Sequence, residues 1–108
     1  MNPAFLLGGE LEVGRLGFGA MRVVGDRAEG ARVVRRAVEL GVTLIDTADI
    51  YGAGVSEEVV AAALHPYPEG VVIATKGGLG YGLQERIRDG RPEHLREACE
   101  GSLKRASL

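Results

Sequence analysis

Asp46, Tyr51 and Lys76 are three polar residues of the types needed to donate a proton to a carbonyl oxygen. A free tyrosine has a pKa of about 10 and is a poor proton donor at neutral pH. A nearby ammonium stabilises the phenolate and lowers that pKa, and a carboxylate paired with the ammonium keeps the lysine charged and oriented. Tyr51 is therefore a candidate general acid, with Lys76 and Asp46 behind it.

Taken one at a time, these residues have simpler interpretations. Asp46 alone suits a turn at the end of a strand, Lys76 alone suits a solvated surface, and Tyr51 alone suits a half-buried position. Their chemistry depends on their being brought together, so the elements that carry them decide the interpretation.

Hydrophobic periodicity predicts a hairpin followed by three repeats of a strand and a helix. The hairpin covers residues 4–15, with Gly8 and Gly9 as a two-residue turn that tolerates positive φ angles. The three strands begin near residues 16, 43 and 71, which suits βαβ crossovers of roughly 30 residues. The run over 71–74 is typical of a strand covered on both faces.

The first two predicted helices have recognisable ends. Asp26 and Glu29 form a capping-box pattern, and Gly41 is placed to end the first helix in a left-handed conformation. Ser56 is the expected N-cap of the second helix, which the segment 65–68 stops with two prolines.

The last part of the chain predicts a glycine-rich loop over 77–91 and a helix with Pro92 at its first position. Within the loop, Gly78–Gly82 lacks the following GK[ST] of a phosphate-binding loop, and a flexible substrate-side loop is expected instead. Cys99 is expected to be a small core residue of the helix. The apolar stripe of this predicted helix consists of Leu95, Ala98, Cys99 and Leu103.

Alternating strands and helices imply a parallel sheet. An open doubly wound sheet and part of a (β/α)8 barrel both fit, and the spacing does not separate them. In both, ligands bind at the carboxyl ends of the strands. The polar segments 19–22, 46–52 and 75–78 each follow a strand, so we expect the acid, the phenol and the amine to meet at one edge.

Composition and charge exclude several other classes. The 108 residues are 45% hydrophobic and 26% charged, which is ordinary for one soluble globular domain. The 13 basic and 15 acidic residues lack the clustered positive charge that binds nucleic acid. One cysteine and two histidines argue against a disulfide framework or a metal site. With no membrane span of about 20 apolar residues and no signal peptide, we expect a cytoplasmic protein without membrane partners.

Several segments resemble, in order and at the right spacing, those of the aldo-keto reductases. The segment from Asp46 to Gly52 (DTADIYG), followed by Ser56–Glu58, is similar to the family's DTAxxYG…SEE pattern. The remaining matching segments cover the first-strand loop, the third-strand lysine segment and the third helix: Gly17–Arg22, Ile73–Gly78, Asp89–Leu95 and Ser102–Arg105.

This resemblance implies a (β/α)8 barrel capped by an N-terminal hairpin, and the reduction of aldehydes and ketones to alcohols with NADPH or, less often, NADH. From the family's tetrad of aspartate, tyrosine, lysine and histidine it implies Asp46 as the partner of the lysine, Tyr51 as the acid/base and Lys76 as the group that tunes the tyrosine. It also implies that Asp46 contacts the nicotinamide end of the cofactor together with the first-strand loop, Gly19, Ala20, Met21 and Arg22.

The family's histidine belongs at the end of a fourth strand, and the sequence stops at Leu108 before it. A full barrel takes about 250 residues, so residues 1–108 resemble an N-terminal portion truncated after the third βα unit. His94 is not expected to replace the histidine, because it lies in the first turn of an outer helix. We therefore expect a reductase of small carbonyl compounds whose activity is impaired in this short chain.

Two other interpretations stay open. The first is a non-catalytic fragment or vestigial domain that self-associates or pairs with a complementary barrel fragment, because three units leave open strand edges. The second is an independent three-stranded flavodoxin-like domain. Strand order separates the second from the barrel, which requires neighbouring strands in sequential order.

Overall fold

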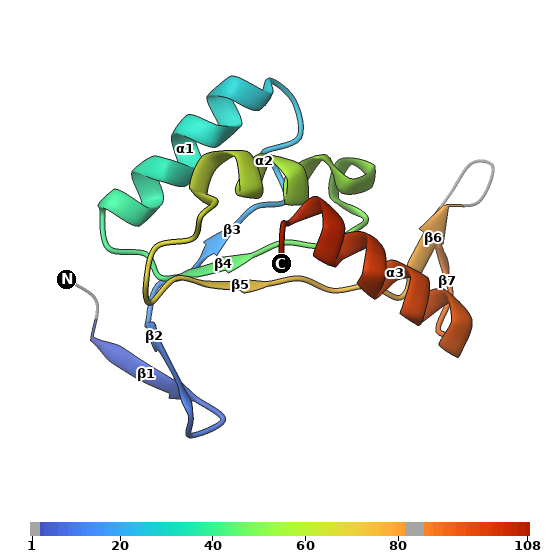
Figure 1. The fold of residues 1–108 in the computed structure, drawn as a ribbon, viewed down its shortest axis with the longest axis horizontal. Helices are drawn as coiled ribbons and strands as arrows, with labels where there is room; N and C mark the ends of the chain where they lie inside the picture. The colour runs from blue at the N-terminus through green and yellow to red at the C-terminus, as the bar shows by residue number, and fades with distance from the viewer. Residues whose placement is uncertain (1–2, 82–85) are drawn as a thin grey trace.

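The computed structural model describes residues 3–81 and 86–108, and Figure 1 shows the arrangement of its elements. A hairpin comes first, then three parallel strands separated by helices, then a second small hairpin and the last helix. The elements are β1 Ala4–Leu7, β2 Leu11–Gly14, β3 Phe18–Gly19, α1 Arg27–Glu39, β4 Leu44–Asp46, the 3₁₀ turn η1 Tyr51–Gly54, α2 Val55–Leu64, β5 Val72–Ala74, β6 Leu79–Tyr81, β7 Arg86–Arg88 and α3 Pro92–Arg105.

The first hairpin is confirmed, with a turn one residue longer than predicted. Leu7 pairs with Leu11, so three residues separate β1 from β2. Gly8 and Gly9 have φ angles of 60° and 78°. The Glu10 N–H donates to the Leu7 carbonyl at 3.2 Å, so the two glycines make the tight turn that their freedom at positive φ allows.

The strands β3, β4 and β5 form a parallel sheet in sequential order. Phe18 lies opposite Ile45, and Ile45 lies opposite Ile73. This order disagrees with the flavodoxin-like alternative, in which the first strand would lie between the other two. β3 begins two residues later than the strand predicted from residue 16.

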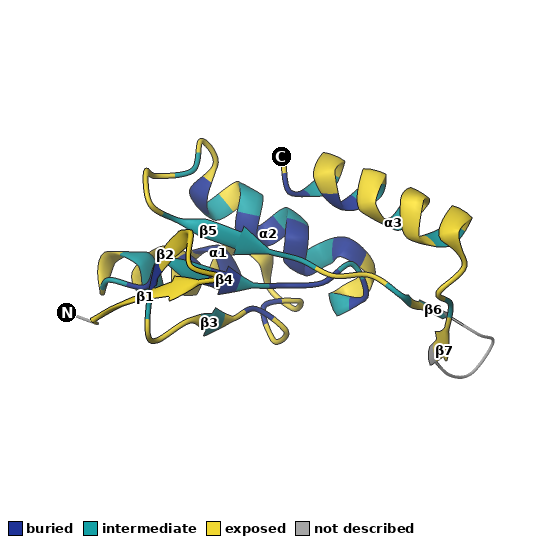
Figure 2. Cartoon of the chain, turned by 90° about the horizontal axis from the view of Figure 1, so that it is seen from below, coloured by how far each residue is buried: buried dark blue, intermediate teal, exposed yellow. Residues whose placement is uncertain are grey.

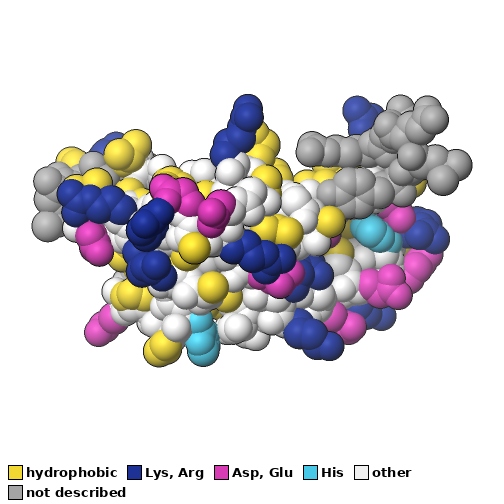
Figure 3. All heavy atoms as spheres, turned by 90° about the horizontal axis from the view of Figure 1, so that it is seen from above, with side chains coloured by type: hydrophobic (Ala, Val, Ile, Leu, Met, Phe, Trp, Pro, Cys, Tyr) yellow, Lys and Arg dark blue, Asp and Glu magenta, His cyan; other side chains and the backbone are white. Residues whose placement is uncertain are grey.

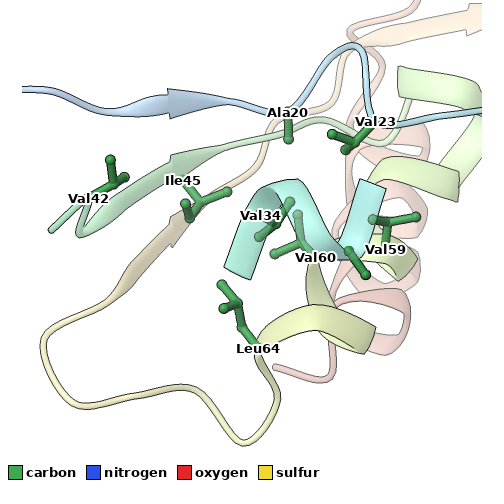
Figure 4. Packing of buried hydrophobic residues seen from close by; sticks show 9 residues of the cluster. Ala20, Val23, Val34, Val42, Ile45, Val59, Val60 and Leu64 are labelled. Carbon is green, nitrogen blue, oxygen red and sulfur yellow. The ribbon is translucent and has the colours of Figure 1, made fainter. Parts of the chain in front are cut away.

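The core lies between the sheet and the two helices α1 and α2 (Figure 4). Ile45 of β4, Val34 of α1 and Val60 of α2 are each 0% exposed. Ala20 and Val23, from the loop after β3, belong to the same cluster. Full burial of a side chain of this size contributes about 1.5–3 kcal/mol, so this cluster holds both helices on the sheet.

The opposite face of the sheet is only half buried. Side chains alternate along a strand, so Leu44, Val72 and Ala74 point away from the core that Ile45 enters, and all three have intermediate burial. The prediction that residues 71–74 are covered on both faces is therefore wrong for the described chain, because α1 and α2 cover one face only (Figure 1).

Both ends of α1 and the C-terminal end of α2 were predicted correctly, but the N-cap of α2 was not. The Asp26 carboxylate accepts the Glu29 N–H at 3.0 Å, and Gly41 follows the helix with a φ of 102°. The predicted N-cap Ser56 lies inside α2, which begins one residue earlier after Gly54, whose φ is 97°. Ser56 does not cap the helix because its hydroxyl bonds to two groups outside it.

A second antiparallel hairpin, β6–β7, occupies part of the segment predicted to be a loop over 77–91. Leu79 pairs with Arg88, and Gly80 pairs with Ile87. Each of these strands has three residues, which is too short for an alternating pattern to identify a strand. The tip, residues 82–85, lies outside the described residues, and so does the end of the predicted substrate-side loop Gly78–Gly82.

The helix α3 begins at Pro92 as predicted, and most of its surface is exposed (Figure 2). Of the predicted apolar stripe, only Ala98 is among its more buried positions. Leu95 and Leu103 are 41% and 46% exposed, and Cys99 is exposed rather than a core residue. Small and polar residues face the molecule instead because a buried ion pair, described below, holds this helix. The more buried positions are His94, Ala98, Gly101, Ser102, Arg105 and Ala106.

The arginine-rich side of α1 is exposed to solvent. Arg27 and Arg36 form exposed ion pairs at 3.2 Å with Glu58 and Glu39. On the face drawn in Figure 3, basic side chains lie among acidic ones rather than in a patch of one sign. Across residues 3–81 and 86–108, no helix combines the length and apolar character that a membrane crossing needs.

Candidate active site

Asp46 and Lys76 lie at the carboxyl ends of β4 and β5. Asp46 is the last residue of β4, and Lys76 follows the end of β5 by two positions, so alternation directs both away from the helical core. The Lys76 ammonium donates to Asp46 Oδ1 at 3.0 Å, to Asp46 Oδ2 at 3.1 Å and to the Thr47 carbonyl at 2.7 Å. The predicted pair is thus formed, with acceptors for all three ammonium protons.

Tyr51 reaches this pair through an unusual turn. Three residues in succession, Gly52, Ala53 and Gly54, have positive φ angles of 62°, 53° and 97° between Tyr51 and α2. Two of the three are glycines, which adopt this conformation without the steric cost of a side chain. The Lys76 ammonium lies 5.2 Å from the centroid of the Tyr51 ring, within the range of a cation–π contact. The structure therefore brings the three predicted residues together.

A cavity of about 370 Å³ opens beside Tyr51 and Lys76. Only Met21 of the predicted first-strand loop lines it; Gly19 and Arg22 line a neighbouring cavity of about 440 Å³, and Ala20 is buried. The residues around the first cavity are Met21, Ala48, Asp49, Ile50, Tyr51, Lys76, Gly77 and Leu79. A small ring or carbonyl compound in this space would have a phenol, an ammonium and apolar side chains around it.

Lys76 keeps its charge at neutral pH. Burial acts to lower its pKa, but the hydrogen bonding and charge of Asp46, with smaller contributions from Tyr51, outweigh burial and hold the pKa of Lys76 above its ordinary value of 10.5. The Lys76 and Asp46 side chains are 51% and 50% exposed, so solvent screens their attraction. The ammonium form is the one that the proton-donor interpretation requires.

A buried network ties the first-strand loop to β4 and α2. The Ser56 hydroxyl donates to the Ala20 carbonyl at 2.7 Å and lies 2.7 Å from the Thr47 hydroxyl. Because Ser56 uses its one proton on Ala20, Thr47 is the donor in the second bond. The Ala20 N–H donates to the Asp46 carbonyl at 2.8 Å, so both backbone polar groups of the residue before Met21 are held in place.

Sequence reasoning missed Glu57, Thr75 and Arg105. Glu57 is 0% exposed and accepts from Arg105 Nε at 2.8 Å and from the Thr75 hydroxyl at 2.7 Å. The available signal was helical spacing, since Glu57 stands three residues before Val60 and seven before Leu64 on the buried face of α2. An acidic residue on such a face requires a partner.

Asp49 and His94 lie at a second cavity of about 380 Å³ behind Tyr51. Burial and then the charge of Glu57 raise the pKa of Asp49, against the opposing charges of Arg105 and His94. His94 Nδ1 lies 3.4 Å from Asp89 Oδ2, and its ring does not line the Tyr51 cavity. Within the described ranges, no three His, Cys, Asp or Glu side chains gather to hold a metal ion.

The sequence profile of the aldo/keto reductase family matches residues 15–108. The chain belongs to the aldo/keto reductase family. It is 42% identical over 109 residues to an uncharacterized oxidoreductase of Schizosaccharomyces pombe, an alignment that covers 93% of this chain and 35% of that protein. The resemblance drawn from the sequence motifs is thereby confirmed.

Solved aldo-keto reductases have the same fold over this stretch. The holo form of a Bacillus halodurans aldo-keto reductase has a TM-score of 0.90 and 31% identity, over 100% of this chain and 37% of that one. A Klebsiella pneumoniae aldo-keto reductase in complex with NADPH has a TM-score of 0.77 and 25% identity, over 100% and 36%. The chain thus spans about a third of the length of these relatives and has the α/β fold of the corresponding part of a TIM-barrel reductase.

Proposed function

We propose that the protein reduces aldehydes and ketones to alcohols with NAD(P)H, and that Asp46, Tyr51 and Lys76 are its catalytic residues. The observation that carries the proposal is the Lys76 ammonium, bound to both Asp46 oxygens and 5.2 Å from the centre of the Tyr51 ring. Tyr51 donates a proton to the carbonyl oxygen of the substrate. Lys76 stabilises the phenolate that remains, and Asp46 keeps Lys76 charged and oriented.

The residues beside Tyr51 fit the nicotinamide end of a dinucleotide. The cavity of about 370 Å³ combines the apolar side chain of Met21 with the phenol and the ammonium. A nicotinamide cofactor, when bound, supplies the hydride. We propose contacts from Asp46 and from the loop Gly19, Ala20, Met21 and Arg22, which follows the neighbouring strand. The NADPH bound by the Klebsiella pneumoniae relative makes NADPH the first cofactor to test.

We further propose that residues 1–108 form a partial barrel domain: the hairpin 4–15 and three βα units over 16–108. The sequential parallel sheet and the coverage of 37% of the Bacillus halodurans reductase support this division. The tetrad histidine implied by the family resemblance has no counterpart beside Tyr51 among the described residues, since the ring of His94 lines a different cavity. Reduction by the isolated 108-residue chain is therefore expected to be impaired, because half a site does not position two substrates.

A chimaera tests the catalytic proposal. The chain replaces the aligned part of the Bacillus halodurans reductase, and oxidation of NADPH is followed with an aromatic aldehyde. We expect turnover that falls roughly 100-fold or more in Tyr51→Phe, the effect of losing a general acid. The matched control is Tyr67→Phe, because the Tyr67 hydroxyl bonds to the Ala106 carbonyl away from the cavity. A folded chimaera in which both variants behave alike contradicts the role of Tyr51.

The isolated chain provides the second arm of this test. Purified residues 1–108 are assayed under the same conditions, and turnover close to that of the chimaera would overturn the expectation of impairment. Binding of NADPH is measured separately, so that weak cofactor binding is not confused with slow chemistry.

A second candidate function is non-catalytic association, through self-association or pairing with a complementary barrel fragment. An apolar cavity of about 600 Å³ between α1 and the edge strand β3 favours it. Val33 and Leu40 around this cavity are 41% and 65% exposed, and they lie among charged side chains beside an open strand edge, where association is favoured. Size-exclusion chromatography of the wild type and of the double variant Val33→Lys/Leu40→Lys tests self-association. A wild-type oligomer that becomes a monomer in the double variant supports self-association. A wild-type monomer counts against it.

A further inference from the structure

We infer that Glu57 is the positioning residue of the candidate active site: one buried carboxylate that fixes both the strand end carrying Lys76 and the turn carrying Tyr51. The catalytic meaning of this inference rests on the proposed function. The positions themselves rest only on contacts within the chain.

The connection from Glu57 to Lys76 runs through Thr75. Thr75 precedes Lys76, so alternation directs Thr75 toward α2 and Lys76 toward the cavity. The Thr75 hydroxyl donates to Glu57 Oε2 at 2.7 Å. This bond fixes the backbone just beyond β5, where a small rotation would carry the Lys76 ammonium away from Asp46.

The connection from Glu57 to Tyr51 runs through Arg105. Arg105 Nε donates to Glu57 Oε1 at 2.8 Å, and its side chain packs over the left-handed turn that follows Tyr51. A methyl group added at Gly54 would lie 2.5 Å from Arg105 Cδ, and one added at Gly101 would lie 2.9 Å from Arg105 Nη1. Arg105 therefore occupies a narrow slot between the turn and α3, close to Gly54 on one side and to Gly101 on the other.

A carboxylate suits this position because it accepts from Thr75 and carries the charge that Arg105 faces. Thr75 and Arg105 each supply a proton, and the two oxygens of a buried carboxylate accept one apiece. A glutamine has one acceptor oxygen, so with Arg105 on that oxygen its amide could meet Thr75 only by reversing the direction of that bond, and the charge facing Arg105 would be lost. The bond to the guanidinium is charge-assisted and so stronger than a neutral one.

The experiment follows the titration of Lys76 in the 108-residue chain. Lys76 and Lys104 are its two lysines, so 13C-labelled side-chain signals report Lys76 directly, with Lys104 as the internal reference. Thr75→Val removes the hydroxyl at nearly constant volume, and Thr75→Ser restores it. Glu57→Gln removes the carboxylate, and Glu58→Gln is its control, because Glu58 is 44% exposed and pairs with exposed Arg27.

Thr75→Val and Glu57→Gln are expected to lower the titration midpoint of Lys76 by about half a pH unit as its contact with Asp46 loosens. Thr75→Ser and Glu58→Gln are expected to match the wild type. A folded Thr75→Val chain with the wild-type midpoint overturns the inference, and so does a Thr75→Ser midpoint as low as that of Thr75→Val. If Glu57→Gln does not fold, the two Thr75 variants decide.

The Lys76 titration and the reductase assay fail independently. The titration needs no cofactor or substrate, so an inactive chimaera with a shifted Lys76 midpoint in Thr75→Val removes the proposed function and leaves the positioning role. An active chimaera together with an unchanged Lys76 midpoint in Thr75→Val supports the proposed function and removes the positioning role of Glu57.

Discussion

The bond between Lys76 and Asp46 orients the ammonium more than it stabilises the fold. Both side chains are about half exposed, and pairs of this kind contribute roughly 0–1 kcal/mol. The ammonium nevertheless has three acceptors, two on Asp46 and one on Thr47, so it has a single defined place at the cavity. The bond therefore fixes the position of the ammonium, as its proposed action on Tyr51 requires.

The Asp46→Asn variant tests how this pair depends on pH. The pKa of Lys76 is raised in the folded chain above its ordinary value of 10.5. Its stabilising effect is therefore fully present below that value and is lost as pH rises through the raised pKa. We expect Asp46→Asn to reduce the free energy of unfolding by about 0–1 kcal/mol at pH 8, and the difference to shrink at strongly alkaline pH. Urea unfolding at several pH values measures it, and a difference independent of pH contradicts the pairing.

The sequence predicted the residues at the cavity but not those that hold them. Asp46, Tyr51 and Lys76 could be identified because parallel strands deliver their carboxyl ends to one edge. Glu57 is an acid in the first turn of a helix, a position that favours interaction with the helix dipole and gives no sign of a buried partner. Its partner Arg105 is 48 residues away, and only the tertiary fold brings the two together.

At the scale of elements, the turn η1 depends on its glycines. Gly54 has a φ of 97° and a methyl group there would lie 2.5 Å from Arg105 Cδ, whereas Gly70 has a φ of 86° and open space around it. Gly70→Ala is therefore expected to cost about 1–2 kcal/mol, the price of a left-handed residue alone.

Gly54→Ala is expected to cost measurably more than Gly70→Ala, because the displacement of Arg105 adds to the backbone term. Chemical unfolding of the two variants measures the difference. Equal losses of unfolding free energy in the two variants would show that the Arg105 side chain moves aside at no cost. That result would contradict its tight packing against Gly54.

The start of α3 is tied to the residue that follows β7 by a bidentate ion pair. Arg91 Nε and Nη2 each lie 2.8 Å from an oxygen of Asp89, and these hydrogen bonds lower the pKa of Asp89 to about 2. The stabilising effect of Asp89 is thus present above its ordinary pKa of 3.8 and lost as pH falls through about 2. In Arg91→Gln we expect the Asp89 carboxyl signal in NMR to titrate nearer 3.8, with Arg96→Gln as the control that leaves it unchanged.

Local sequence patterns predicted α1, which packs on the sheet, better than they predicted the packing of α3, which lies away from the core. α1 has a capping side chain at Asp26 and a left-handed Gly41, both visible in the sequence. The inner face of α3 was assigned incorrectly because an apolar stripe is expected to face a core. This helix instead approaches α2 through Gly101 and the ion pair of Arg105, leaving Leu95 and Leu103 exposed.

At the scale of the whole molecule, the chain has one core on one side of one sheet. The buried cluster joins β4 to α1 and α2, while the other face of the sheet is half open. A domain of this size has a net stability of about 5–15 kcal/mol at most, and a core on one face places this chain near the lower end. The candidate active site depends on that core, because β4 and β5 carry Asp46 and Lys76.

Substitutions at Ile45 test whether this core alone holds the molecule. Ile45 is 0% exposed and belongs to the buried cluster that includes residues of both helices. Ile45→Ala is expected to cost roughly 2–5 kcal/mol and Ile45→Val roughly 0.5–1.5 kcal/mol. The loss in Ile45→Ala is comparable with the whole stability of the chain, so this variant should unfold without a cooperative urea transition, while Ile45→Val retains one.

Leu40→Ala, at a 65% exposed position, is the control and should change stability by no more than about 0.5 kcal/mol. A cooperative transition in Ile45→Ala would mean that contacts outside this cluster, including those of the half-open face, stabilise the chain.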